Sequence, residues 1–392
     1  MSARQYRPTL AEVDVGAIAR TVGRLRAAAG DGVELCAVVK ADGYGHGIVT
    51  AARAALAGGA TWLAVALVEE GVALRSAGID APVLVLSEPP PSAAPALLAH
   101  GLTPTVYRPD MLRALDDAAA ERGEVARVHL KLDTGMARVG VAPEDRDAVV
   151  ALLAASRWLD VEGVQTHLAR ADEPHAATTA EQLARFGAGL GVVGAGGLAP
   201  RLVHVANTAA TLVHTSAWRT MVASAMPGAV PLVRAGIGIY GLDAGPQVTA
   251  AAHALEPAMR LVSAVSHVRR IAEATPVSYG HRWASPAAGW LATVPIGYAD
   301  GVPRTLTGRL DVLHGGVRRP VVGTVTMDQV LVWCGDDEPT VGDEVVLIGA
   351  QHDASGDTVR IGMEEWAERL DTITYEIATG ISARVPRVEV GG

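Results

Sequence analysis

The chain has 392 residues, 49% of them hydrophobic and 4% aromatic, so it can bury a large core in two domains or in one barrel with an appendage. Its formal charge is −9 and no lysine- or arginine-rich block stands out, which argues against nucleic acid or an anionic membrane as a partner. We expect a soluble cytoplasmic protein without disulfides or a metal site, because Cys36 and Cys334 lie far apart and neither a signal core nor an apolar run of about 18 residues occurs.

The first part of the chain alternates between short β-branched apolar runs and alanine-rich charged stretches with helical spacing. The apolar runs predict eight strands at 34–40, 61–67, 82–87, 102–107, 126–133, 161–168, 201–207 and 232–241. Helical stretches lie between them, at 46–59, 69–78, 108–123 and 178–190. This alternation predicts a (β/α)₈ TIM-type barrel over residues 1–250, with a doubly wound parallel sheet as the alternative.

The pattern changes after about residue 250. Turn residues now separate strand-like runs at 258–271, 290–301, 318–335 and 343–351, and only 362–370 has a clear helical pattern. Residues 251–392 are therefore predicted to form a separate, mainly antiparallel β domain. The predicted fold class is α/β, a TIM-type barrel followed by this β domain.

Polar residues lie where several of the predicted barrel strands end. They are Lys40, the segment 133–138, His167, Asn207, Thr208, Arg234 and Gly236. In barrels of this kind the chemistry collects at the carboxyl ends of the strands, whereas the opposite end mostly serves stability. The sequence therefore predicts an active site at this one rim.

The loops after the seventh and eighth strands have features of a phosphate site. The segment 207–210 offers a hydroxyl and backbone N–H groups at a helix start, and Gly236 and Gly238 let bare backbone approach a ligand. A lysine in a partly desolvated site becomes a nucleophile for an aldehyde. Together these features favour pyridoxal 5'-phosphate, which carries both an aldehyde and a phosphate, held covalently by Lys40.

Nine segments match, in order, the motifs of the bacterial alanine racemases. They are VVKADGYGHG, HLKLDTGMARVG, VEGVQTHLARADE, VHVANTAA, VRAGIGIYG, VSYG, VPIGYADGVPR, GTVTMDQ and ITYEI with ISARVPR. The chain thus resembles this family of pyridoxal-phosphate-dependent isomerases over nearly its whole length. The resemblance implies a homodimer that interconverts L-alanine and D-alanine and supplies D-alanine for peptidoglycan.

The resemblance also implies two acid/base residues, Lys40 and Tyr279, on opposite faces of the cofactor, with Tyr279 coming from the second subunit. Racemisation removes the Cα proton from one face and returns one to the other, so a single fixed base is poorly placed for both steps. A tyrosine with a pKa near 10 needs support to act as a base, and His167 and Arg234 would provide it. Arg234 would also donate to the pyridine nitrogen and keep it largely unprotonated. Related decarboxylases place a carboxylate there, so Arg234 favours a racemase.

Further roles follow only from the resemblance. Cofactor-binding positions are Tyr44, Arg138, Asn207, Thr208, Gly236, Ile237 and Tyr375. Arg138 and the backbone N–H of Met327 would meet the substrate, and the entrance would be lined by Asp172, Tyr298 and Arg304. Lys131 matches a lysine that is carbamylated in some family members, and an ordinary ion pair with Asp133 is the alternative.

Three positions depart from the family pattern. Thr208 stands where serine is common, Ala137 where glycine is usual, and Thr326 where we expect cysteine. Thr326 and the entrance residues leave open a racemase of broader scope or a serine-type racemase of the same family. A cofactor-carrying binding protein is disfavoured, because barrels of that kind lack a β domain with the VSYG and TVTMDQ motifs.

Overall fold

The computed structural model describes residues 6–392 and divides into two compact units. The barrel unit runs from Gly16 to Pro257, and the β unit combines the chain up to Val15 with the segment from Ala258 to Gly392. Strand β1 (Leu10–Asp14) lies in the β unit, although the sequence placed residues 1–250 in the barrel. The reason is strand pairing, since β1 is antiparallel to β10 (Met259–Ala264) and parallel to β20 (Arg387–Val390).

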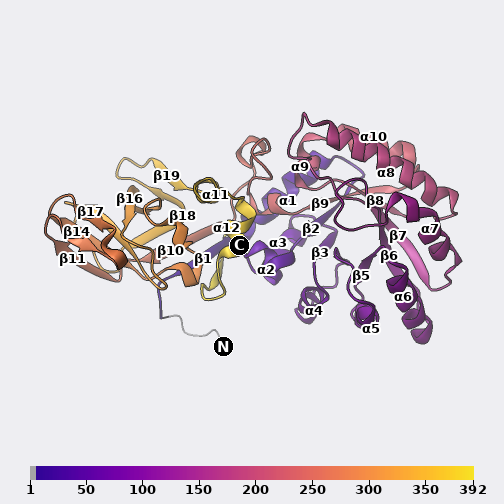
Figure 1. Ribbon diagram of the computed structural model, residues 1–392, viewed down its shortest axis with the longest axis horizontal. Coiled ribbons are helices and arrows are strands. Elements are labelled where there is room, and N and C mark those ends of the chain that lie inside the picture. Colours follow the sequence, from indigo (N-terminus) through magenta and orange to yellow (C-terminus); the bar gives the residue numbers. More distant parts are fainter. Residues whose placement is uncertain (1–5) are drawn as a thin grey trace. The chain divides into compact units, whose positions relative to one another are not determined.

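The barrel unit is a closed ring of eight parallel strands, as the sequence predicted (Figure 1). The strands are β2 (Glu34–Val38), β3 (Trp62–Val65), β4 (Val83–Val85), β5 (Thr103–Val106), β6 (Ala126–Lys131), β7 (Leu159–Gln165), β8 (Leu202–His204) and β9 (Val230–Ala235). Strand β9 pairs with β2 and closes the ring. The last strand ends earlier than predicted, because the backbone of Gly236 leaves the extended region and Ile237–Tyr240 form the short helix η3.

Helices surround the strands of this barrel (Figure 1). They are α1 (Val15–Ala29), α3 (Ile48–Ala57), α4 (Val68–Ser76), α5 (Ala94–Ala99), α6 (Pro109–Arg122), α7 (Arg146–Ala155), α8 (Ala177–Ala195) and α10 (Thr215–Ala225). Helix α1 was not among the predicted helices, although Ile18, Val22 and Leu25 recur at helical spacing and are buried together on one face. The helices thus cover the outer face of the ring and leave its two ends open to loops.

The β unit is built on a largely antiparallel sheet in the order β11-β14-β17-β16-β15-β18-β10-β1-β20, with β19 paired to β18. Its further strands are β11 (His267–Ile271), β14 (Gly289–Val294), β15 (Asp311–His314), β16 (Val317–Val322), β17 (Val330–Gly335), β18 (Glu344–His352) and β19 (Thr358–Ile361), and a separate pair is β12 (Pro276–Val277) with β13 (Trp283–Ala284). Two helices follow, α11 (Met363–Leu370) and α12 (Thr374–Gly380), of which the sequence predicted only the first. The predicted architecture of a barrel plus a mainly antiparallel β domain is confirmed.

Both cysteines are buried free thiols. Burial raises the pKa of Cys36 to about 12, so this thiol stays protonated and unreactive. Among the described residues, no helix has the length and apolar character needed to cross a bilayer. Within 6–392, no group of three or more histidine, cysteine, aspartate or glutamate side chains is arranged to hold a metal ion.

Candidate active site

Lys40 lies at the carboxyl end of β2, at the start of a left-handed turn labelled α2 (Lys40–Tyr44) in Figure 1. Residues 41–45 all have positive φ, between 50° and 81°. This conformation costs about 1 kcal/mol or more for each residue that carries a side chain. Glu70 stabilises the turn by accepting a hydrogen bond from the N–H of Ala41 at 2.6 Å. Backbone strain of this kind clusters at functional sites, so the turn supports a role for the lysine that begins it.

Aromatic packing beneath this turn holds it in place. His46 is fully buried, its Nδ1 lies 2.9 Å from the carbonyl oxygen of Tyr44, and its ring stacks on Tyr240 with centroids 4.4 Å apart. The hydroxyl of Tyr240 donates to the carbonyl of Val38 at 3.2 Å, which ties this packing back to β2. His46 therefore packs beneath the turn and has a structural role there.

Four basic side chains, Lys40, Lys131, Arg138 and Arg234, act on one another at the carboxyl end of the barrel. Burial, and then the charge of Arg138, lowers the pKa of Lys40. Burial, followed by Arg234, Arg138 and Lys40, lowers the pKa of Lys131 to about 8. These two residues are the only lysines among the 33 lysines and arginines of the chain. A lowered pKa favours the neutral amine of a lysine, a form that an arginine does not adopt.

Arg234 joins three strands through its guanidinium, which is almost fully buried. Its Nη1 donates to Nδ1 of His204 at 3.0 Å and to the carbonyl of the same residue at 2.9 Å. Its Nη2 donates to the carbonyl of Thr166 at 2.6 Å and to Nδ1 of His167 at 3.2 Å. Burial lowers the pKa of Arg234 to about 10, so the group stays protonated at neutral pH. In the described part of the chain its Nε–H has no hydrogen-bond partner and remains available to a ligand.

His167 follows β7, and its contact with Arg234 decides its tautomer. Because a guanidinium can only donate, Nδ1 of His167 must accept, and the ring proton sits on Nε2. Burial, and then Arg234 and the other cations, lowers the pKa of His167 well below its ordinary value. The ring is therefore neutral and offers one N–H donor from Nε2.

Thr208 and two glycines form a close-fitting cradle after β8 and β9. The hydroxyl of Thr208, the first residue of α9 (Thr208–Val213), accepts hydrogen bonds from the N–H groups of Gly236 at 3.1 Å and Gly238 at 3.4 Å. A Cβ at Gly236 would lie 2.8 Å from the hydroxyl of Tyr44, and one at Gly238 would lie 2.4 Å from the methyl group of Thr208. Only glycine fits either position, so bare backbone, two hydroxyls and peptide N–H groups meet here.

Three more of the predicted barrel residues lie in loops or caps near these strand ends. Asn207 caps α9 by accepting from the N–H of Ala210 at 3.0 Å, and Ile237 is buried at the start of η3. Asp172 lies in the loop after β7, where a Cβ at Gly245 would approach its side chain to 2.5 Å. The barrel thus brings the predicted residues from the ends of β2, β6, β7, β8 and β9 to one rim.

The loop after β6 carries Arg138, which is exposed. Oδ1 of Asp133 accepts hydrogen bonds from three backbone N–H groups of this loop, at 2.9, 3.1 and 3.2 Å. No ion pair joins Lys131 to Asp133 or to another carboxylate within the described chain, which weighs against the ion-pair alternative for that lysine. Ala137, where glycine is usual in the family, has φ of 53° and so adopts a strained conformation just before Arg138.

The remaining predicted site residues lie on the β unit. Tyr279, Met327 and Tyr298 have exposed fractions of 74%, 51% and 41%. Arg304 is exposed at the start of η7 (Arg304–Leu306), and Tyr375 is half-buried in α12. Large exposed apolar side chains that gather in one unit are typical of a surface that another molecule covers.

Backbone hydrogen bonds join the loops that carry these exposed residues. The N–H groups of Tyr298 and Ala299 donate to the carbonyls of Thr326 and Met327, at 2.9 and 3.0 Å. The hydroxyl of Thr326 donates to the carbonyl of Gln329 at 2.7 Å and accepts from its N–H at 3.1 Å. Thr326 therefore closes the turn that presents Met327, which gives this departure from the family pattern a local structural role.

Sequence reasoning missed two histidines inside the barrel. His204 and His129 are fully buried, and Nε2 of the first lies 2.9 Å from Nδ1 of the second. Each has apolar residues on both sides, in the runs VHL and VHV, and a single histidine between apolar neighbours was the available signal. They connect to Arg234 and so belong to the environment of the site.

Comparison with known proteins identifies the family. The model described as "Alanine racemase, N-terminal domain" matches residues 13–244, and "Alanine racemase, C-terminal domain" matches 258–389. The chain belongs to the alanine racemase family. The predicted resemblance is thereby confirmed, and with it the class of isomerases to which these racemases belong.

Individual relatives are similar over their full length. The alanine racemase of Thermobifida fusca (strain YX) is 43% identical, covering 97% of this chain and 98% of its own. The crystal structure of the alanine racemase from D-cycloserine-producing Streptomyces lavendulae superimposes with a TM-score of 0.90 at 36% identity, covering 99% and 98% of the two chains. A histidine racemase from Leuconostoc mesenteroides subsp. sake matches with a TM-score of 0.85 at 25% identity over 100% of both chains.

The strained residue before Arg138 yields a testable prediction. Ala137→Gly should raise the free energy of unfolding by about 1 kcal/mol, because glycine adopts the observed φ without a Cβ penalty. Ala151→Gly, in the exposed interior of α7, should lower it by about 1 kcal/mol, because glycine weakens a helix. Denaturant titration of both variants measures the two changes, and a loss of stability in Ala137→Gly would contradict the strain.

Proposed function

We propose that this chain is a pyridoxal-phosphate-dependent racemase that interconverts L-alanine and D-alanine. The observation that carries the proposal is the placement of Lys40, an amine with a lowered pKa at the start of a strained turn, on the same rim as the buried Arg234. Family membership supports alanine as the substrate. A cytoplasmic location and a role in supplying D-alanine for peptidoglycan stay predictions of the sequence.

Several features of the rim fit pyridoxal 5'-phosphate. Lys40 offers the amine for the aldehyde. The cradle of Thr208, Gly236 and Tyr44 leaves no room for a Cβ at Gly236, and its two hydroxyls face the space where a phosphate would lie. The Nε–H of Arg234, which the barrel leaves without a partner among the described residues, is the donor suited to the pyridine nitrogen. When bound, the cofactor supplies an electron sink for the electron pair left at the substrate Cα.

Two residues of the chain move the protons. Lys40 takes or returns the Cα proton on one face, a task for which a lowered pKa suits it because the neutral amine is the base. Tyr279 serves the other face, and the Nε2–H of the neutral His167 is the donor that would stabilise its phenolate. Arg234 stays protonated at neutral pH, so it would hold the pyridine nitrogen as a hydrogen-bond donor and would not transfer a proton to it.

We further propose a homodimer in which each β unit serves the barrel of the partner. Tyr279, Met327 and Tyr298 are exposed in a single chain, although side chains of this size usually pack against other groups. A neighbour that covers them would bring Tyr279 to Lys40, the N–H of Met327 to the substrate carboxylate and Tyr375 to the phosphate. Asp172, Tyr298 and Arg304 would then line the entrance.

A wider substrate range is the second candidate. The fold also serves a histidine racemase that is 25% identical to this chain, so the architecture alone does not set the substrate. Thr326 precedes Met327, and its carbonyl accepts a hydrogen bond from the N–H of Tyr298. A different residue at position 326 can therefore alter the space available to a substrate side chain. The family and the higher identity to alanine racemases favour alanine.

We propose that Lys131 is carbamylated. Its pKa of about 8 leaves a share of neutral amine to react with CO₂ at neutral pH, and the carbamate would place a negative charge beside Arg138. Apart from Lys40 and Lys131, all of the lysine and arginine residues of the chain are arginines. The amine of Lys131 therefore points to chemistry that arginine cannot perform.

The substrate assignment predicts the following assay. Purified protein supplied with pyridoxal 5'-phosphate should convert L-alanine to D-alanine, and faster than serine or a bulkier amino acid in the same panel. Lys40→Ala should abolish turnover, because it removes one of the two proton-transfer groups and the covalent anchor. Formation of D-isomer measured by chiral chromatography decides the outcome, and a clear preference for a bulky amino acid would reject alanine.

The shared site predicts complementation between two inactive variants. Lys40→Ala and Tyr279→Phe should each be inactive as homodimers, but subunit exchange should restore about a quarter of the wild-type rate, because half of the dimers are mixed and each has one intact site. Steady-state assays after exchange, beside unmixed variants, measure the recovery. If the mixture stays inactive although mixed dimers form, both residues act within one chain.

Carbamylation predicts a distinct NMR signal. Protein equilibrated with ¹³C-bicarbonate should show one enriched carbamate resonance that Lys131→Arg removes, because a guanidinium has no free amine to react. The signal should grow as pH rises through about 8, where the amine of Lys131 loses its proton. Lys40→Arg is the matched control and should keep it. A signal that survives Lys131→Arg would refute the assignment.

A further inference from the structure

A line of polar side chains runs through the interior of the barrel, where branched apolar residues usually fill such folds. Arg234 stands near the carboxyl end of β9, and His204 and His129 follow it inward from β8 and β6. Glu162, the middle residue of β7, stands at the other end of the line. Both histidines are fully buried, so bulk solvent does not reach their rings.

Short contacts connect these four side chains in sequence. Nη1 of Arg234 lies 3.0 Å from Nδ1 of His204, and Nε2 of His204 lies 2.9 Å from Nδ1 of His129. Nε2 of His129 has no hydrogen bond within the described chain, and its nearest charged neighbour is Oε2 of Glu162 at 3.7 Å. The line therefore joins a cation to an anion through two imidazoles.

Only one arrangement of protons satisfies these contacts. A guanidinium can only donate, so His204 accepts at Nδ1 and carries its proton on Nε2. That proton is donated to Nδ1 of His129, whose own proton must then sit on Nε2 and face Glu162. Burial lowers the pKa of both His129 and His204, which keeps the two rings neutral and able to accept.

The barrel leaves room for this line and holds its rings in place. A Cβ at Gly163 would lie 2.8 Å from the ring of His129, so glycine is required beside it. The rings of His129 and His204 meet edge to face with centroids 4.9 Å apart, and Trp62 packs against His129 at 5.3 Å. The histidines cannot turn freely in this packing.

The buried charge of Arg234 gives a physical reason for an anion at the other end of this line. No carboxylate pairs with its guanidinium in the described chain, which binds only carbonyl oxygens and imidazole nitrogens. A buried charge without a partner is costly. Burial acts to raise the pKa of Glu162, but contact with His129 and the charges of Arg127 and Arg201 outweigh it and lower this pKa, so the carboxylate is ionised.

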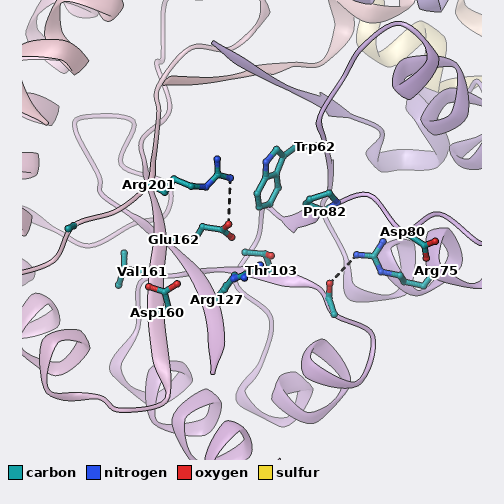
Figure 2. Close-up of a pocket in the computed structure, with 12 residues that line it drawn as sticks. Trp62, Arg75, Asp80, Pro82, Thr103, Arg127, Asp160, Val161, Glu162 and Arg201 are labelled. Atoms are coloured by element: carbon teal, nitrogen blue, oxygen red, sulfur yellow. Dashed lines mark hydrogen bonds and ion pairs between the residues drawn. The ribbon is translucent and has the colours of Figure 1, made fainter. Parts of the chain in front are cut away.

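Glu162 lies far from the rim that carries Lys40. It lines a cavity of about 690 Å³ at the amino ends of the strands, together with Trp62, Arg127 and Arg201 (Figure 2). Arg201 lies 3.6 Å from one of its carboxylate oxygens. Because the amino ends of the strands face away from the active-site rim, Glu162 acts on that rim only through other residues.

We propose that Glu162 is a positioning residue for Arg234, which it orients through His129 and His204 by holding one order of protons along the barrel interior. If Glu162 were neutral, it would no longer favour a proton on Nε2 of His129, and that ring proton could move to Nδ1. His204 would then lose its acceptor and be free to change tautomer, and Arg234 would lose one of its partners. The position and charge of the guanidinium at the rim thus depend on a carboxylate at the opposite end.

The wild-type protein offers a direct test that does not depend on activity. Nitrogen-15 NMR of histidine-labelled holoprotein, assigned with single histidine substitutions, should find His129 and His204 neutral at neutral pH with the proton on Nε2. A proton on Nδ1 of either ring, or a charged ring, would overturn the proposal.

Two substitutions of glutamates that contact Arg201 extend the test. Glu162→Gln should change the ring signals of both histidines and lower kcat about tenfold with little change in KM, as the loss of a supporting partner does. Glu34→Gln is the matched control and should do neither. Glu34 also binds Arg201, at 2.6 Å, and accepts from Nε1 of Trp62 at 2.9 Å, but it makes no contact with His129.

The outcomes separate this inference from the proposed function. If Glu162→Gln leaves the histidine signals unchanged, or if both variants change them alike, the positioning role is refuted. The effect on kcat rests on the proposed racemase activity, whereas the ring signals do not. A protein with the expected signals that fails to racemise alanine would therefore refute the function and leave the positioning role standing.

Discussion

The crowding of four positive charges at one end of the barrel is the constraint on which the site depends. Lys40, Lys131, Arg138 and Arg234 share this rim because the carboxyl ends of parallel strands converge there. Burial and mutual repulsion lower the pKa of both lysines, which favours the neutral amine form of each. An anionic phosphate and a substrate carboxylate would relieve the repulsion. The same crowding therefore favours ligand binding and prepares a nucleophile.

The choice between lysine and arginine carries information in this chain. Of its 33 basic residues only two are lysines, which leaves 33 − 2 = 31 arginines. Arginine holds its proton even when buried, as Arg234 does with a pKa of about 10, and serves where a fixed charge is needed. Lysine occurs only at positions 40 and 131, where burial lowers the pKa, to about 8 at Lys131. The distribution separates fixed charges from reactive amines.

Much of the fold and of the rim followed from the sequence, because alternating strands and helices have few stable arrangements. The polar residues that end several of the apolar runs also marked the rim in advance. Other features depend on tertiary contacts and had no local signal. Strand β1 joins the β unit through pairing with residues about 250 positions away, and the left-handed turn after Lys40 depends on Glu70. The line from Arg234 to Glu162 exists only because four strands place their side chains in one interior.

The account makes Lys40 the residue that holds the cofactor, although Lys131 also has a lowered pKa on the same rim. Borohydride reduction of the protein loaded with pyridoxal 5'-phosphate, followed by peptide mass mapping, distinguishes them directly, since no other lysine exists in the chain. The account predicts a stable pyridoxyl group on the peptide that contains Lys40 and none on Lys131. A label on Lys131, or no label on either lysine, would contradict it.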